Sequence, residues 1–155
     1  MSITIKLRDR SIKITDDVLN LMNTYRQLSS TDFEAGGILI GRENIDSSNL
    51  IVEYATEPYK NDKRKHYSFI RKDKAHIDFF NKLYNENGKI YCYIGEWHTH
   101  PEKCPVYSSI DLKNWRKIAK SNSDKEKVYY HLIVGEDSVC IWEYCLIDNR
   151  VQKIY

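Results

Sequence analysis

The sequence predicts a mixed α/β domain (mixed α+β), in which one sheet has helices on both sides and a functional site at one end. Three observations lead to this prediction. Short runs rich in β-branched and aromatic residues recur along the chain, and stretches with apolar residues at helical spacing separate them. A cluster of histidine, serine and aspartate directly follows one of the strand-like runs. A chain of 155 residues is long enough for one core, so we expect a single domain over residues 1–155.

The first part of the chain is expected to alternate strands with one helix. Residues 3–7 and 11–14 have the composition of short strands. Thr15 is a suitable N-cap for a helix. The inward face of this helix would carry apolar residues at helical spacing: Val18, Leu21, Met22 and Tyr25. A buried strand is then expected at residues 38–40, and another at 50–56 beyond a turn.

The rest of the chain continues this pattern. A second helix is expected over residues 73–87 and would end at Gly88. Its inward residues would be Ile77, Phe80 and Tyr84. The later strands are expected at residues 89–97, 128–134, 139–147 and 151–155, the second and third of them paired as a hairpin.

Two histidines at the end of the 89–97 run are the centre of the candidate site. Residues two apart on a strand point to the same face, so His98 and His100 are expected to project together, with Thr99 opposite. Pro101 has no backbone N–H and would help to end the strand. Two neutral imidazoles side by side are good zinc ligands, and zinc needs a third protein ligand and an open fourth position. Asp111 would be that third ligand if the chain folds back over the strand end.

The segment from Ser108 to Asp111 has two compatible interpretations. Ser108 is a good N-cap, and Asp111 stands at the third helical position, as in a capping box. An apolar stripe at helical spacing follows: Leu112, Trp115 and Ala119. Taken alone, this tetrapeptide is more simply a helix cap, because caps are common. Placed after two histidines, it also holds a carboxylate in a fixed first turn that would face a metal ion.

Two stretches together resemble the signature of the JAMM (MPN+) metallopeptidases. Residues 34–41, Glu-Ala-Gly-Gly-Ile-Leu-Ile-Gly, match the glutamate at a glycine-rich strand. Residues 98–111 match His-x-His-Pro, six further residues and Ser-x-x-Asp, in order and spacing. The resemblance covers about residues 15–147. It implies a JAB1/MPN-like fold, with a mixed sheet flanked by helices and a zinc site at one end of the sheet.

The resemblance also implies a role for each matching residue. One Zn²⁺ ion per chain would be bound by His98, His100 and Asp111. Glu34 would take a proton from the zinc-bound water and later give it to the leaving amine, as general base and then general acid. Ser108 would donate a hydrogen bond to the oxyanion of the tetrahedral intermediate. Activated water is the nucleophile, so no covalent acyl-enzyme is needed.

Glu34 depends most on the fold, because it lies far from the histidines in the sequence and could instead be a surface residue at a strand start. Glu96 competes for the role of base, since it shares the strand parity of His98 and His100. Eukaryotic members of the family usually have an apolar aromatic residue there, so Glu96 departs from their pattern. We interpret Glu96 as a supporting or substrate-facing residue, and exchange of the two roles remains open to test.

The chain is also similar to the small peptidases of type II CBASS antiphage operons, through its short length and its Gly95-to-Glu102 stretch. That resemblance implies an isopeptidase that cleaves after the extended C-terminal tail of a protein substrate. The partner would be a cGAS-like nucleotidyltransferase or another ubiquitin-like conjugate. Three alternatives stay open: a peptidase that trims a ubiquitin-like sulfur carrier, a non-catalytic MPN scaffold that only binds partners, and a DNA-repair-type relative.

Composition and charge narrow the range of possible binding partners and locations. The formal net charge is only +2, and no apolar run is long enough to cross a membrane. The N-terminus lacks the apolar block of a signal peptide, so a cytoplasmic location is expected. Residues 59–74 are basic with interleaved aromatic residues. We expect a solvated loop there rather than a nucleic-acid patch, and we also consider that it holds the substrate tail.

We expect structural roles for most of the cysteines, for the tryptophans and for two of the histidines outside the candidate site. The cysteines contain no Cys-x-x-Cys pair and are expected to be free thiols. Cys104 lies in the loop between the candidate ligands, whereas three lie in apolar runs: Cys92, Cys140 and Cys145. The tryptophans are expected in the core: Trp97, Trp115 and Trp142. His76 and His131 are expected to be buried histidines with satisfied hydrogen bonds.

Overall fold

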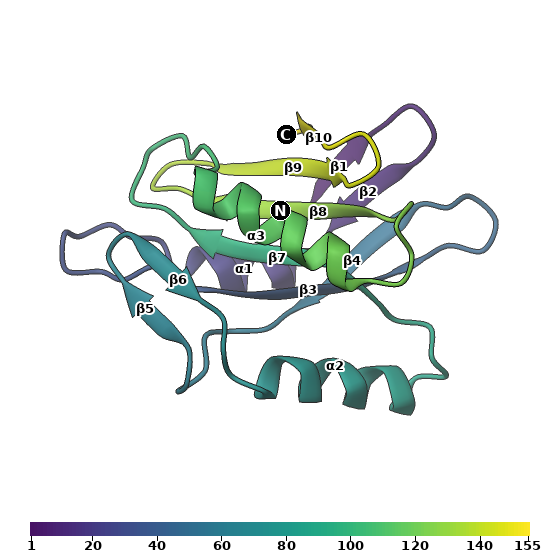
Figure 1. Cartoon of the computed structure of the whole chain (residues 1–155), viewed down its shortest axis with the longest axis horizontal. Helices are drawn as coiled ribbons and strands as arrows, with labels where there is room; N and C mark the ends of the chain where they lie inside the picture. Colours follow the sequence, from purple (N-terminus) through teal and green to yellow (C-terminus); the bar gives the residue numbers. More distant parts are fainter.

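In the computed structural model, which describes residues 1–155, a large curled mixed sheet carries three helices, and a small hairpin stands apart from it (Figure 1). The strands are β1 (Ile3–Lys6), β2 (Ser11–Ile14), β3 (Gly36–Glu43), β4 (Leu50–Ala55), β5 (Lys63–Lys65), β6 (Ser68–Ile70), β7 (Cys92–Thr99), β8 (Val128–Val134), β9 (Val139–Cys145) and β10 (Arg150–Lys153). The helices are α1 (Asp16–Asn23), α2 (Ala75–Glu86) and α3 (Ser109–Ser121).

Eight strands form the main sheet, in the order β1-β2-β4-β3-β7-β8-β9-β10. Two neighbouring pairs are parallel, β2 with β4 and β7 with β8, and the others are antiparallel. β7 therefore has β3 on one side and β8 on the other. Because β7 and β8 run in the same direction, their carboxyl ends meet at one edge of the sheet, where His98 pairs with Ile133.

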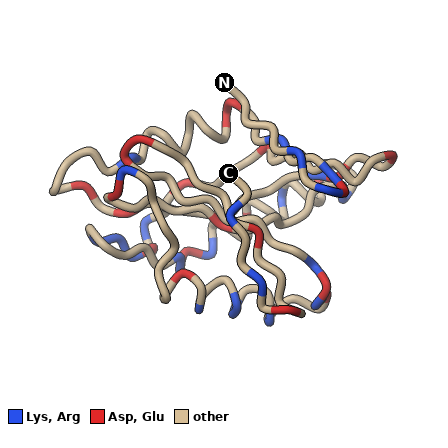
Figure 2. The backbone as a smooth tube through the Cα atoms, turned by 90° about the horizontal axis from the view of Figure 1, so that it is seen from above, with Lys and Arg blue, Asp and Glu red and all other residues tan.

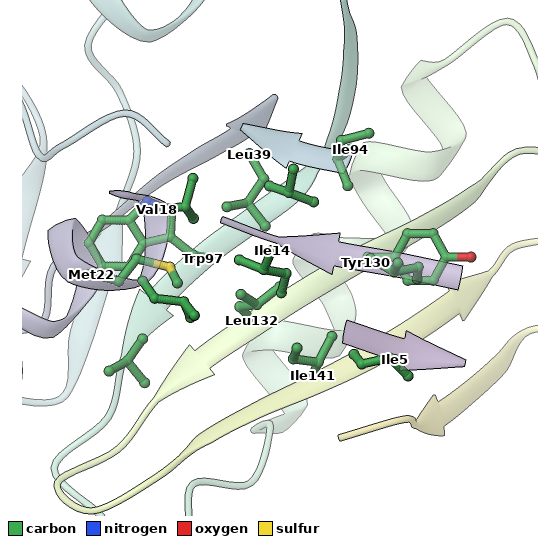
Figure 3. Packing of buried hydrophobic residues seen from close by; sticks show 14 of the residues in the cluster. Ile5, Ile14, Val18, Met22, Leu39, Ile94, Trp97, Tyr130, Leu132 and Ile141 are labelled. Atoms are coloured by element: carbon green, nitrogen blue, oxygen red, sulfur yellow. The ribbon is translucent and has the colours of Figure 1, made fainter. Parts of the chain in front are cut away.

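The main core lies inside the curl of the sheet. Ile5 of β1 and Ile141 of β9 come from opposite ends of the strand order, yet they belong to the same buried cluster (Figure 3). Val18 and Met22 of α1 pack into this cluster as well. Burial of apolar surface on this scale is the dominant stabilising term in folding.

The other two helices pack on the opposite face of the sheet. Trp115 and Ala119 of α3 join a cluster with residues of β8 and β9. Phe80 and Leu83 of α2 pack against Ile38 of β3 in a third, smaller cluster. Helices therefore cover both faces, and the predicted mixed sheet flanked by helices is confirmed.

The strands and the helix after Ser108 lie where the sequence predicts them, to within a few residues. The largest shift among these strands is in the run predicted at 89–97, because β7 begins only at Cys92. Lys89 has a left-handed backbone (φ 62°), as has Gly88 (φ 66°), so the chain turns there before it extends. The three tryptophans are buried, as expected.

The inward faces of α1 and α2 differ from the predictions. In α1, Leu19 is buried with Val18 and Met22, whereas Leu21 is only partly buried. Thr15 is the N-cap by position, but its side chain makes no capping hydrogen bond. In α2 the predicted Ile77 is 41% exposed, and the side chains packed on the sheet come from Phe79, Phe80 and Leu83. The face of α2 is displaced by one position, whereas in α1 only Leu21 is replaced, by Leu19, and Tyr25 packs against the core as predicted. Packing decides these differences and apolar spacing does not.

The basic segment at residues 59–74 is not the solvated loop that the sequence suggests. It contains the antiparallel hairpin of β5 and β6, which forms its own two-stranded sheet. The hairpin lies beside the end of β3 (Figure 1). Acidic and basic residues are interspersed along the chain trace (Figure 2). No helix combines the length and the apolar character needed to cross a membrane.

The curled core generates a prediction for stability. Leu132 is fully buried in the main cluster, so Leu132→Ala should lower the free energy of unfolding by about 2–5 kcal/mol through lost burial and a residual cavity. Leu28 is 74% exposed, and Leu28→Ala is the matched control, with an expected change within about 0.5 kcal/mol. Urea unfolding followed by circular dichroism measures both. Equal losses in the two variants would contradict the assigned core.

Candidate metal centre

The end of β7 places two imidazole rings side by side. His98 lies in the strand, and His100 follows it, held by a hydrogen bond from its backbone N–H to the Val134 carbonyl (3.0 Å). The Nε2 atoms of the two rings are 2.9 Å apart. Thr99 points to the other face, where its Oγ1 accepts a hydrogen bond from the backbone N–H of Ala35 (2.9 Å). The expected strand parity is therefore found.

Asp111 reaches the two histidines from the first turn of α3. Its Oδ1 lies 3.1 Å from His98 Nε2, and its Oδ2 lies 3.3 Å from His100 Nε2. The capping box is complete, since Ser108 Oγ accepts from the Asp111 N–H and Asp111 Oδ2 accepts from the Ser108 N–H. The helix cap is confirmed, and the same carboxylate is positioned to be the proposed metal ligand, so the two interpretations are compatible.

Ser108 is positioned beside the cluster rather than free within it. Its Oγ lies 2.8 Å from Asp111 Oδ2 and donates a hydrogen bond to that oxygen. The hydroxyl therefore orients the Asp111 carboxylate in this structure. It must turn its O–H away from Asp111 before it can donate to any group bound in the site.

The three side chains fit a zinc ion. One atom from each of His98, His100 and Asp111 lies within 4.8 Å of the other two. Tetrahedral zinc with bonds of about 2.0–2.1 Å separates its ligand atoms by about 3.3 Å, close to the 2.9–3.3 Å measured here. Two imidazoles and one carboxylate also form a donor set that suits zinc better than calcium or magnesium.

Burial and charge set the ionisation of the cluster. Burial tends to raise the pKa of Asp111, but hydrogen bonds from His100, His98 and Ser108 outweigh it and hold this pKa well below its usual range. The pKa of His100 is raised, because Asp111 favours the charged ring more than burial opposes it. Asp111 is accordingly the ionised member of the cluster, as a metal ligand needs to be.

Glu34 lies just before β3 and is buried, with 5% of its surface exposed. It lines the same pocket as the two histidines and Asp111. Burial raises its pKa to about 8, His100 partly opposes this rise, and the carboxylates of Asp111 and Glu102 add to it. The alternative of a surface glutamate is therefore wrong. A divalent cation beside it would favour its ionised form.

Glu96 faces the same pocket, as its strand parity predicts, but it is already paired. Its Oε1 accepts hydrogen bonds from Arg71 Nε (2.8 Å) and from Tyr93 Oη (3.3 Å). The guanidinium neutralises the Glu96 carboxylate, whereas no cationic side chain pairs with Glu34 in this way. Glu34 is thus the better candidate for a base, and Glu96 a residue of the pocket wall.

The pocket is a groove of about 590 Å³ between the β5–β6 hairpin and α3. The hairpin contributes Tyr67 and Ile70, and the helix contributes Ile110 and Lys117. Gly36 allows the hairpin to approach, because a Cβ there would lie 2.6 Å from the Phe69 ring. Sequence reasoning considered this segment as a holder of the substrate tail but did not predict the hairpin, and only the fold brings it to the end of β7.

Two further histidines are buried outside the cluster. His76 is satisfied at both ring nitrogens, by Thr56 Oγ1 (2.5 Å) and Asp62 Oδ2 (2.7 Å). His131 stacks on Trp115 with ring centroids 4.5 Å apart, and its Nδ1 accepts from the Glu96 N–H (3.2 Å), but its Nε2 has no partner. The expectation of satisfied histidines is right for His76 and only half right for His131. Burial lowers the pKa of His131 to about 3.

Comparison with known proteins identifies similar chains in bacteria. Residues 24–144 match the family described as prokaryotic homologs of the JAB domain. A protein of Escherichia coli (strain TW11681) named CD-NTase/cGAS isopeptidase is 36% identical over 107 residues, covering 69% of this chain and 67% of that protein. Proteins of the same name from Pseudomonas aeruginosa and Vibrio cholerae are 30% and 32% identical, over 84% and 82% of this chain and 80% and 78% of theirs.

Solved structures support the fold. A Desulfitobacterium hafniense protein with a known solution structure aligns with a TM-score of 0.60 at 18% identity, over 90% of this chain and 87% of that one. The family match spans every residue of the candidate site, from Glu34 to Asp111.

The geometry of the three ligands generates a prediction about metal content. We expect the purified protein to hold about one zinc ion per chain. Less than about 0.1 zinc ion per chain is expected in each ligand variant, because two remaining ligands bind zinc too weakly. The variants are His98→Ala, His100→Ala and Asp111→Ala. Plasma mass spectrometry after dialysis gives the stoichiometry. His66→Ala is the control, since His66 lies on the hairpin turn and bonds to the Asp32 carbonyl. Native zinc content in all three ligand variants would contradict the site.

The buried His131 generates a prediction about pH. Its pKa is about 3 when folded and about 6.5 when unfolded, so the unfolded chain binds the extra proton. Its contribution to stability is complete above about pH 6.5 and is lost as the pH falls toward 3. At pH 5 the loss is about 2 kcal/mol. His131→Asn, which keeps an acceptor for the Glu96 N–H, should show a shallower decline between pH 7.5 and 5 in urea unfolding. Parallel pH profiles for the two proteins would refute this assignment.

Proposed function

The chain belongs to the family of prokaryotic homologs of the JAB domain, and from this membership we propose that it is a zinc-dependent isopeptidase. The bond hydrolysed would be the amide that joins the C-terminus of a protein to another group. The observation that carries the proposal is the convergence of two imidazole nitrogens and one carboxylate beside the buried Glu34. The isopeptidase names of the relatives support the same reaction.

The residues of the site have distinct chemical tasks in this proposal. His98, His100 and Asp111 would hold the ion. A bound zinc ion would lower the pKa of water to about 7 and polarise the scissile carbonyl. Glu34 would accept the proton of the attacking water and deliver it to the leaving amine as the C–N bond breaks. Ser108 would turn its hydroxyl from Asp111 to the carbonyl oxygen, where negative charge develops.

The groove beside the site suits an extended peptide tail. β6 is paired only with β5, so its other edge can offer backbone N–H and C=O groups to a further strand. Lys63 and Lys65 are exposed on the hairpin and would attract acidic groups of a substrate protein. The relatives are named for CD-NTase/cGAS, so we propose a nucleotidyltransferase of that kind, joined through its C-terminal tail, as the substrate.

The decisive experiment uses a linear fusion of such a nucleotidyltransferase, through its C-terminal tail, to a reporter protein. The native protein should cleave the fusion, and a chelator should stop cleavage until zinc is restored. Glu34→Gln should reduce kcat by at least about 10³-fold with zinc still bound, because the amide cannot accept the proton. Glu96→Gln is the matched control, and its activity should remain within about tenfold of native.

The outcomes separate the proposal from its alternatives. Full activity in Glu34→Gln together with loss in Glu96→Gln would exchange the roles of the two carboxylates. Cleavage that ignores the chelator would exclude metal chemistry. Tight binding of the fusion without any cleavage by the zinc-loaded protein would indicate a non-catalytic scaffold. Cleavage of a ubiquitin-like sulfur-carrier precursor instead of the fusion would indicate a carrier-trimming peptidase.

A further inference from the structure

Both backbone polar groups of Glu34 have a hydrogen-bond partner on the β5–β6 hairpin. Its backbone N–H donates to the carbonyl of Lys65 (2.8 Å). Its backbone carbonyl accepts from Arg64 Nε (2.8 Å). Glu34 lies outside β3, so the main sheet does not by itself fix its backbone.

Arg64 differs from the two lysines beside it on β5. Lys63 and Lys65 are exposed, whereas Arg64 is half-buried. Besides the Glu34 carbonyl, its guanidinium donates to the neighbouring carbonyl of Phe33 (3.3 Å) and lies over the ring of Tyr25, 5.7 Å from its centroid. A planar guanidinium can reach two carbonyls and stack on an aromatic ring at once, and an ammonium group cannot.

The hairpin is itself anchored, so it can serve as a fixed support. Asp62 accepts backbone hydrogen bonds from both ends of the hairpin segment, at Tyr59 and at Lys72 and Asp73. It also accepts from Nε2 of the fully buried His76. His76 Nδ1 is hydrogen-bonded to Thr56 Oγ1, and Thr56 adjoins the end of β4 in the main sheet. A buried chain of side-chain hydrogen bonds thus ties the hairpin to the sheet.

We propose that Arg64 is a positioning residue for the reaction, which sets the backbone of Glu34 and through it the direction of the carboxylate. This inference rests on the proposed isopeptidase function. In this inference the two faces of β5 have different tasks. The exposed lysines contact the substrate protein, whereas Arg64 acts on Glu34 and never meets the substrate. Small displacements of a catalytic group reduce the chemical step strongly and leave binding of the substrate tail almost unchanged.

The test separates kcat from KM on the same fusion substrate. Arg64→Ala and Arg64→Lys should each lower kcat, by about 10–100-fold for alanine and less for lysine, with KM within about twofold and zinc content unchanged. Lys63→Glu and Lys65→Glu should instead raise KM, because they reverse charge on the substrate side. Arg42→Ala is the matched arginine control; Arg42 pairs with Glu53 at the other end of β3, and its loss should leave kcat and KM as in the native protein.

Chemical rescue by guanidinium ion gives a result that a purely structural role of Arg64 would not produce. Guanidinium ion at non-denaturing concentration should restore part of kcat in Arg64→Ala and none in the double variant Glu34→Gln/Arg64→Ala. If Arg64→Ala does not fold, Arg64→Lys keeps the stem and the charge, and its kcat decides. A raised KM with native kcat in the Arg64 variants would make Arg64 a substrate contact and overturn the inference. Full activity of Glu34→Gln would instead overturn the proposed function, so the two failures are distinguishable.

Discussion

The contact between Asp111 and the two histidines is the interaction on which the site depends. It joins the first turn of α3 to the carboxyl end of β7, two elements whose positions have separate causes. β7 presents both imidazoles because alternate residues share a face and because β3 and β8 hold the strand on either side. α3 presents the carboxylate because the capping box fixes its first turn. Asp111 Oδ2 completes the helix cap and also faces His100, while Oδ1 faces His98, so one carboxylate serves both the helix and the site.

Four carboxylates line the same groove, and three of them have clearly different surroundings. Asp111 is ionised, because histidine and serine hydrogen bonds outweigh the cost of burial. Glu96 forms an ion pair with the guanidinium of Arg71. Glu34 has no such partner, and burial raises its pKa to about 8, near the range in which a group both takes and gives protons. Separation of carboxylate pKa values by environment is how enzymes assign acid, base and ligand roles to chemically identical groups.

The β5–β6 hairpin links recognition to chemistry. One of its strands lines the groove, and the other holds Glu34 through backbone and guanidinium hydrogen bonds. Its anchor, the buried chain from Asp62 through His76 to Thr56, is polar throughout and fully hydrogen-bonded. A polar network of that kind specifies one arrangement where an apolar contact would allow several. The family match includes the hairpin as well as the ligands, because it runs from residue 24 to residue 144.

The sequence by itself determined the elements whose causes are local. Strand periodicity placed His98 and His100 on one face, the Ser-x-x-Asp pattern predicted the start of α3, and runs rich in β-branched and aromatic residues predicted most strands of the sheet. Only the tertiary structure determined the features that depend on contacts between segments far apart in the sequence. It buried Glu34, paired Glu96 with Arg71, and turned a basic stretch that reads as a solvated loop into the hairpin beside the site. The hydrogen bond from Arg64 to the Glu34 carbonyl joins residues 30 positions apart in the sequence, so no local pattern encodes it.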